Sequence, residues 1–220
     1  MVKQKETGNL IIISGPSGAG KDTVVSKLLE KNNNIVLSIS KTTREPRKGE
    51  EEGKDYFYVT KEEFLKEIDE GNFLEYAIVY GDNYYGTPKD KVLKNINNGK
   101  DVILVIDIQG ALKVKEIMPE AIFIFIMPPS MKELKSRLIK RDTESSKKLL
   151  DRFKTAYKEI NEATKYNYVV INDRVNKAVK KVESIIVAEK CRVDRIEDFD
   201  LNSEQELIHE LLVEKGLTKA

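Results

Sequence analysis

The stretch Leu10-Ile11-Ile12-Ile13-Ser14, followed by Gly15-Pro16-Ser17-Gly18-Ala19-Gly20-Lys21-Asp22-Thr23, decides the fold. Its apolar run predicts a short strand buried on both faces, and the apolar spacing at residues 24–29 predicts a helix after the glycine-rich turn. Glycines let a backbone wrap around a phosphate chain. The loop N–H groups, the helix N-terminus and Lys21 supply positive potential there. This strand, loop and helix therefore predict a phosphate-binding loop.

One position departs from the usual pattern of such loops. The residue after the lysine is normally Ser or Thr, whose hydroxyl binds Mg²⁺, but here it is Asp22. One interpretation is a carboxylate that favours the helix N-terminus, where the helix dipole stabilises it by about 0.3–1 kcal/mol. The other is that Asp22 helps to hold Mg²⁺, directly or through water. Without a metal between them, Asp22 would repel a nucleotide, and the sequence leaves these interpretations open.

The rest of the chain alternates short apolar runs with helical patterns. The strands expected are Leu10–Ser14, Ile35–Ser40, Val102–Asp107, Ile122–Met127 and Tyr168–Asn172. Capping boxes predict helices after Thr60 and Ser130, and Thr87 before Pro88 predicts the N-cap of another helix, closed by Gly99. This alternation predicts an α/β fold: a mostly parallel five-stranded sheet with helices on both faces.

Two segments interrupt the alternation and suggest a domain organisation. We expect a core from residues 1–40, 102–135 and 161–190, and a small α+β insertion at 41–101, with strands near Asp55–Val59 and Phe73–Tyr80. Residues 136–160 are basic and helical and form a candidate lid. Residues 191–220 form a helical extension, with an amphipathic helix over about 203–214.

Composition limits the classes of function. The 220 residues carry 38 Lys and Arg against 37 Asp and Glu, so the net charge of +1 gives no reason to expect binding to nucleic acid or to a membrane. One cysteine, Cys191, cannot form an internal disulfide, and one histidine, His209, leaves little for a metal cluster. The longest stretch without charge, Thr7 to Gly20, is too short to span a bilayer. We expect a soluble, cytoplasmic protein of undetermined oligomeric state.

Many separate motifs, in order over about residues 8–190, resemble those of guanylate kinases. They are the loop Gly15–Lys21, Ser40-Lys41-Thr42-Thr43-Arg44-Glu45-Pro46-Arg47, Gly53-Lys54-Asp55-Tyr56, Glu75, Tyr84-Tyr85-Gly86-Thr87, Asp107-Ile108-Gln109-Gly110, Arg137 with Arg141, Arg152, and Ile171-Asn172-Asp173. The resemblance implies a P-loop NTPase-type sheet with a GMP-binding insertion and a lid. It also implies Mg²⁺-dependent phosphoryl transfer from ATP to GMP, and leaves open whether dGMP is accepted.

The resemblance assigns the insertion to GMP. Ser40, Arg44, Arg47, Tyr56 and Tyr85 would hold its phosphate, for which planar bidentate arginine donors are suited. Glu75 and Thr87 would read guanine, with Asp107 beside them. A carboxylate accepts both adjacent donors of the guanine pairing edge, whereas adenine presents an acceptor there.

The resemblance assigns the loop Gly15–Thr23, Arg137 and Asn172 to ATP, with Asn172 near the adenine. Lys21, Arg44, Arg141, Arg152 and Asp107 would act at the transferred group, by direct in-line transfer without a covalent intermediate. Asp142 stands where the family usually has a small or amide residue. Two alternatives are a related P-loop kinase with another acceptor and a non-catalytic guanylate-kinase-like domain that binds phosphopeptides. The intact loop and lid arginines argue against the second.

Overall fold

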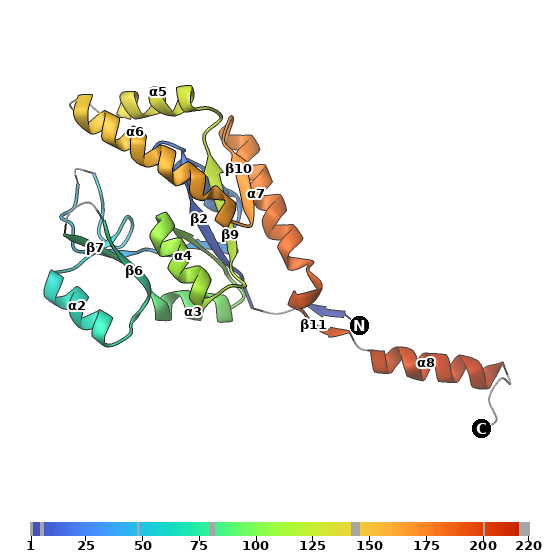
Figure 1. Ribbon diagram of the computed structural model, residues 1–220. Helices are drawn as coiled ribbons and strands as arrows, with labels where there is room; N and C mark the ends of the chain where they lie inside the picture. Colours follow the sequence, from blue (N-terminus) through green and yellow to red (C-terminus); the bar gives the residue numbers. More distant parts are fainter. Residues whose placement is uncertain are drawn as a thin grey trace. The chain divides into compact units, whose positions relative to one another are not determined.

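A parallel sheet of five strands forms the centre of the larger part of the protein (Figure 1). The computed structural model describes residues 2–4, 7–47, 49–79, 82–141, 146–199 and 201–215. The strand order is β10 (Tyr168–Ile171), β9 (Ile122–Met127), β2 (Leu10–Ser14), β8 (Asp101–Val105) and β3 (Ile35–Leu37), and all neighbouring pairs are parallel. The expected α/β fold is confirmed.

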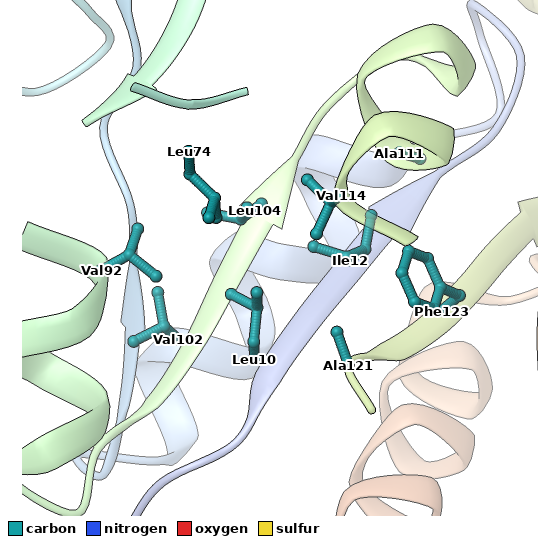
Figure 2. Packing of buried hydrophobic residues seen from close by; sticks show 10 residues of the cluster. All are labelled: Leu10, Ile12, Leu74, Val92, Val102, Leu104, Ala111, Val114, Ala121 and Phe123. Carbon is teal, nitrogen blue, oxygen red and sulfur yellow. The ribbon is translucent and has the colours of Figure 1, made fainter. Parts of the chain in front are cut away.

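Alternate residues of the central strands face one layer of helices. Ile12 of β2 lies between Leu104 of β8 and Phe123 of β9 in the register of the sheet. Figure 2 shows these residues packing with Val92 of α3 (Lys89–Asn97) and Val114 of α4 (Ile108–Ile117). This cluster also includes Leu10, Leu74, Val102, Ala111 and Ala121.

The opposite face of the sheet is also covered. Ile11, Ile13 and Ile103 are 0% exposed, and the period of two in a strand directs them away from α3 and α4. The helices α1 (Lys21–Lys31) and α7 (Val175–Lys190) contribute further buried residues. Burial on both faces explains why these strands have continuous apolar sequences instead of alternating ones.

The insertion is a four-stranded sheet with one helix. Its order is β5 (Phe57–Tyr58), β4 (Lys41–Thr42), β7 (Asn83–Pro88) and β6 (Phe73–Val79), with α2 (Lys61–Asp69) between β5 and β6 in the chain. The expectation that Thr87 caps a helix is wrong. Thr87 lies in β7, the N-cap of α3 is Pro88, and no side chain forms a capping bond there.

Two helices, α5 (Met131–Arg141) and α6 (Ser146–Asn161), form the segment expected to be a lid. They share a small core of Leu134, Leu138 and Ala156, each 0% exposed. The predicted cap at Ser130 is present, since its Oγ accepts a bond of 3.1 Å from the N–H of Glu133. Asp142 lies outside the described residues.

The chain divides into two compact units, Thr7–Ser184 and a smaller one made of Met1–Glu6 and Ile185–Ala220. In the smaller unit, β1 (Val2–Gln4) pairs antiparallel with β11 (Ile196–Phe199), and α8 (Leu201–Glu214) follows, matching the amphipathic helix expected at 203–214. Within the described ranges, no helix has both the length and the apolar character needed to cross a membrane.

Candidate active site

The loop after β2 has the backbone conformation of a phosphate-binding loop. Gly15, Gly18 and Gly20 have φ values of 148°, 84° and 87°, a region that favours glycine. A Cβ at Gly15 would lie 2.2 Å from the carbonyl oxygen of Ile126, so the loop also needs glycine there for space. Gly20 is the N-cap of α1, and the first-turn N–H groups of this helix therefore point into the loop.

Lys21 and Asp22 stand at the start of α1. The Nζ of Lys21 donates to the carbonyl oxygens of Gly15 at 2.6 Å and Pro16 at 3.3 Å, so its ammonium lies across the mouth of the loop. Asp22 and Thr23 are exposed in the first turn of the helix. A carboxylate in that place suits the helix N-terminus, and its oxygens are of the ligand type that Mg²⁺ prefers.

Asn172 and Arg137 hold the same loop from the side of β10 and α5. Asn172 is 2% exposed, and its Nδ2 donates to the carbonyl oxygen of Ala19 at 2.8 Å. Arg137 reaches the carbonyl oxygens of Ala19 at 3.4 Å and Asn172 at 3.2 Å. A Cβ at Gly20 would come within 2.5 Å of the Asn172 Nδ2, which shows how closely the two segments approach.

The helices α5 and α6 lie against the phosphate loop. Arg152 on α6 donates from Nη2 to the Oγ of Ser17 at 2.9 Å. From α5, Leu138 and Leu134 pack over Gly18, where an added Cβ would lie 3.2 Å and 3.3 Å from their methyl groups. Arg141 is the last residue of α5, and its side chain lies outside the described part of the structure.

Glu159 on α6 also faces this loop, although no sequence motif pointed to it. Burial raises the pKa of its carboxyl group, whereas the Lys21 charge and a hydrogen bond from the Ser17 N–H lower it; the Asp107 charge raises it further. Its Oε2 is buried without a hydrogen-bond partner. Helical spacing is the one sequence signal that could have pointed to Glu159, because residues 152 and 159 are seven apart and share one face of α6.

On the insertion, Arg44 is the centre of a polar cluster. Its Nε donates to the Tyr85 hydroxyl at 3.1 Å, and its Nη2 donates to both carboxylate oxygens of Glu50 at 2.9 Å. The Tyr56 ring meets the Tyr85 ring edge-on with centroids 5.8 Å apart, and the Arg44 Cζ lies 5.4 Å from the Tyr56 centroid. The structure thus brings together three of the five residues expected at the GMP phosphate.

The remaining two residues lie on either side of Arg44 in the chain. Ser40 is half-buried between β3 and β4, and Arg47 is exposed. Glu50, which the sequence reasoning missed, also accepts from the Arg47 N–H at 2.8 Å and from the Tyr58 hydroxyl at 2.9 Å. Burial alone would raise the pKa of Glu50, but hydrogen bonds from Arg47 and Arg44 hold it below its usual value. In sequence, Glu50 stood out no more than its acidic neighbours.

Glu75 and Thr87 form a buried pair across β6 and β7. They face each other in the register, and the Thr87 Oγ1 donates to the Glu75 Oε1 at 2.7 Å. Burial raises the pKa of Glu75 to about 7, the Thr87 bond opposes this, and the Asp107 charge adds to it. Asp107 is the N-cap of α4, where its Oδ1 accepts from the Gly110 N–H at 2.8 Å.

Electrostatic effects connect these groups into one region. The Asp107 charge acts on Glu75 of the insertion and on Glu159 of α6. The Asp22 charge acts on the phenol of Tyr56, whose pKa is raised chiefly by burial. These effects link residues of the loop, of the insertion and of α6 to Asp107, which follows β8 at the carboxyl edge of the sheet, the edge at which parallel sheets bind ligands.

Comparisons with known proteins agree on one family. A family model described as guanylate kinase matches residues 7–189. A guanylate kinase of Clostridium tetani is 62% identical over 94% of this chain and 99% of its own length. One from Caldanaerobacter subterraneus subsp. tengcongensis is 59% identical over 93% of this chain and 98% of its own. The crystal structure of guanylate kinase from Anaplasma phagocytophilum has a TM-score of 0.74 and 37% identity, over 98% of this chain and 99% of that one.

Proposed function

The chain belongs to the guanylate kinase family, and we propose how its residues carry out the reaction of that family, phosphoryl transfer from ATP to GMP with release of ADP and GDP. The chain is accordingly an ATP-dependent nucleoside monophosphate kinase. We assign residues 1–40, 102–135 and 161–190 to its core, 41–101 to GMP, 136–160 to a lid and 191–220 to an extension. Two parts of this division differ from the packing: Met1–Glu6 and residues 185–190 belong to the smaller compact unit, and α3 of the 41–101 segment packs on the core sheet.

The phosphates of ATP bind the loop Gly15–Thr23. Their charge is met by the N–H groups of the first turn of α1 and by the Lys21 ammonium, which moves from the carbonyls of Gly15 and Pro16 onto the phosphates. Asn172 and Arg137 act mainly by fixing the loop backbone, since both donate to the Ala19 carbonyl. Both lie on the ATP side of the site.

GMP binds along the insertion. Arg44, Tyr85 and Tyr56 hold its phosphate together with Arg47 and Ser40, and the bidentate geometry of arginine suits a dianion. The guanine lies against Glu75, with Thr87 and Asp107 beside it. Because Thr87 occupies only part of the acceptor capacity of the Glu75 carboxylate, that carboxylate can still accept the two donors of the guanine edge.

The transfer itself needs positioning and charge neutralisation more than acid–base chemistry. Lys21, Arg44, Arg141 and Arg152 surround the phosphoryl group as its charge shifts from the leaving to the attacking oxygen. Asp107, the N-cap of α4, acts beside them. With insertion and lid closed over both substrates, water that would otherwise hydrolyse ATP is excluded.

The reaction of this family typically uses Mg²⁺, and the residues present fit that ion. Mg²⁺ prefers oxygen ligands and is usually bound through one or two carboxylates, substrate phosphates and waters. Asp22 offers an exposed carboxylate beside the loop and would hold the ion directly or through water. When bound, the ion neutralises charge on the phosphates of ATP.

The buried Glu75–Thr87 pair carries the proposal, because it distinguishes a guanine acceptor from other acceptors of P-loop kinases. The test is a coupled assay of ADP release with ATP and Mg²⁺, offering GMP, AMP, CMP, UMP or no acceptor. We expect turnover with GMP alone. In Glu75→Ala, turnover with GMP should fall by a factor of 10² or more, on the order expected when a specific hydrogen-bonding site is lost.

Glu70→Ala is the matched control, since Glu70 is an exposed carboxylate five residues earlier and its removal should leave turnover unchanged. Equal turnover with GMP in Glu75→Ala and wild type would leave the reaction in place but refute the guanine site. Turnover of the wild type with another acceptor, and none with GMP, would refute the proposed substrate.

A further inference from the structure

Glu159 is a lid residue that the mechanism above does not use, yet it reaches the phosphate loop. It shares one face of α6 with Arg152, and both contact Ser17. Arg152 donates to the Ser17 hydroxyl at 2.9 Å, and the Ser17 N–H donates to the Glu159 carboxylate. One loop residue is therefore held by two side chains of the same helix, a basic one and an acidic one.

The surroundings of Glu159 argue against a solvated surface carboxylate. Ala156, one helical turn earlier on the same face, is 0% exposed, and the Glu159 Oε2 is buried without a hydrogen-bond partner. The positive group that acts most strongly on the carboxylate is Lys21. Glu159 as a whole is half-buried, but a buried carboxylate oxygen without a partner is costly, so its presence next to the phosphate loop calls for a compensating role.

Glu159 does not compete with ATP for the amides of the helix. Ser17 lies between Gly15 and Gly18 in the loop, whereas the donors that a helix leaves without an intrahelical acceptor are those of its first turn, at residues 21–23. The Lys21 charge stabilises the carboxylate, and the Lys21 ammonium donates to carbonyl oxygens of the loop. The carboxylate can therefore orient that ammonium as it moves from the loop to the phosphates.

We propose that Glu159 is a positioning residue for phosphoryl transfer, which orients Lys21 and, with Arg152, fixes the phosphate loop when α6 lies on it. This rests on the proposed function and adds a residue to that same site. The hydrogen bond to Ser17 couples the loop to the lid, and the negative charge acts on Lys21. The two contributions are separable, because an amide keeps the acceptor and loses the charge.

The experiment compares Glu159→Gln, Glu159→Ala and the wild-type chain. Asp151→Asn is the matched control, because Asp151 is an exposed carboxylate on the same helix. We measure kcat, the KM for ATP and the KM for GMP of each protein. We also measure the rate of ATP hydrolysis in the absence of GMP, divided by the rate of phosphoryl transfer to GMP. Thermal unfolding and calorimetric binding of GMP establish that the variants are folded.

In Glu159→Ala, we expect kcat to fall about 10- to 100-fold. The KM for ATP and the hydrolysis-to-transfer ratio should rise, while the KM for GMP stays within about twofold of wild type, because the GMP groups are on other elements. In Glu159→Gln, the ratio should return towards wild type, since Ser17 keeps its acceptor, but kcat should stay reduced. Asp151→Asn should match wild type throughout.

Wild-type kcat and KM for ATP in both Glu159 variants would overturn the positioning role. Full recovery of kcat in Glu159→Gln would overturn the action of the charge on Lys21. If Glu159→Ala lost GMP affinity in proportion to a lowered Tm, Glu159 would be a purely structural residue. This result would also overturn the positioning role. A wild-type chain without GMP-dependent turnover would instead overturn the proposed function, and the inference with it.

Discussion

Glu75 has to be charged to accept the guanine donors, yet it lies where charge is disfavoured. Burial raises its pKa to about 7, and the nearby Asp107 charge acts in the same direction. The folded pKa is thus above the ordinary value of 4.5, so the folded protein binds more protons than the unfolded chain between these values. Glu75 therefore costs stability as the pH rises through this window, and it is only partly charged at neutral pH.

This pKa predicts a pH dependence of GMP binding. One unit below a pKa of about 7, only about a tenth of the protein has a charged Glu75, so the KM for GMP should rise about tenfold between pH 8 and pH 6. The phosphate of GMP also titrates near pH 6. In Glu75→Gln, the GMP phosphate still titrates but the carboxyl group at position 75 is gone. The KM of this variant for GMP should therefore vary less with pH. Identical pH profiles of the two proteins would contradict the prediction.

Gly110 offers a way to move the same carboxylate without removing it. A Cβ at this position would lie 2.7 Å from the Glu75 Oε2. In Gly110→Ala, the carboxylate has to shift, and we expect the KM for GMP to rise about tenfold or more while the KM for ATP is unchanged. Glu116→Ala, at an exposed position of the same helix, is the control. Equal changes in both KM values would indicate a general disturbance of α4 and refute this reading.

Single residues were predictable where their chemistry was visible in a local motif. The glycines of the phosphate loop have the conformations that their type implies. Thr87 shows how a local motif misleads: its hydroxyl could cap a helix before Pro88, but the hairpin brings Glu75 within 2.7 Å and takes that donor. Glu50 and Glu159 could not be selected from many glutamates, because only the tertiary fold sets them beside Arg44 and Ser17.

At the scale of elements, α2 supports the hairpin that carries Glu75 and Thr87. Phe64 of α2 is 0% exposed and stacks on Phe73 of β6, with ring centroids 4.4 Å apart. The helix begins with the predicted capping box: the Glu63 N–H donates to the Thr60 Oγ1 at 3.2 Å, and the Thr60 N–H donates to the Glu63 carboxylate at 2.9 Å. The capping box thus stabilises α2 without taking part in the proposed site.

We therefore expect Thr60→Ala to lower the free energy of unfolding by about 1 kcal/mol, the usual effect of losing an N-cap, with kcat unchanged. Denaturant unfolding followed by circular dichroism measures the free energy of unfolding, and the coupled assay measures kcat. Glu62→Ala is the control, since Glu62 is exposed in the same turn and takes no part in the box. A loss of kcat without a loss of stability would show that α2 acts on the site in another way.

Helices and strands could be predicted where their burial produces a recognisable pattern of apolar residues in the sequence. The inner strands β9, β2 and β8 were expected because both of their faces are covered and their runs are continuously apolar. The edge strands β3 and β10 are apolar too, although Val169 and Ile171 of β10 are about half exposed. The expected strand Ile35–Ser40 is three residues too long, because β3 ends at Leu37, before the chain enters the insertion. The strand β4 has only two residues, too few for a periodic signal, and β7 contains Gly86 and Pro88, which favour turns.

At the scale of the whole molecule, the proposed chemistry is confined to one of the two compact units. Every residue assigned a role, from Gly15 to Asn172, lies within Thr7–Ser184. The smaller unit has its own polar contacts, in which Glu189 pairs with Arg192 at 3.3 Å and Arg195 at 3.1 Å. Each unit thus has interactions that do not depend on the residues of the proposed site.

This separation predicts that α8 is dispensable for turnover. Its apolar residues Leu207, Ile208 and Leu211 are 60%, 55% and 49% exposed, so removing them takes little from a buried core. A chain ending at residue 200 keeps β1 and β11, and we expect its kcat and both KM values within about twofold of the full chain. The coupled assay on both chains, with Tm measured beside it, tests this. Lost turnover at an unchanged Tm would mean that the extension takes part in catalysis.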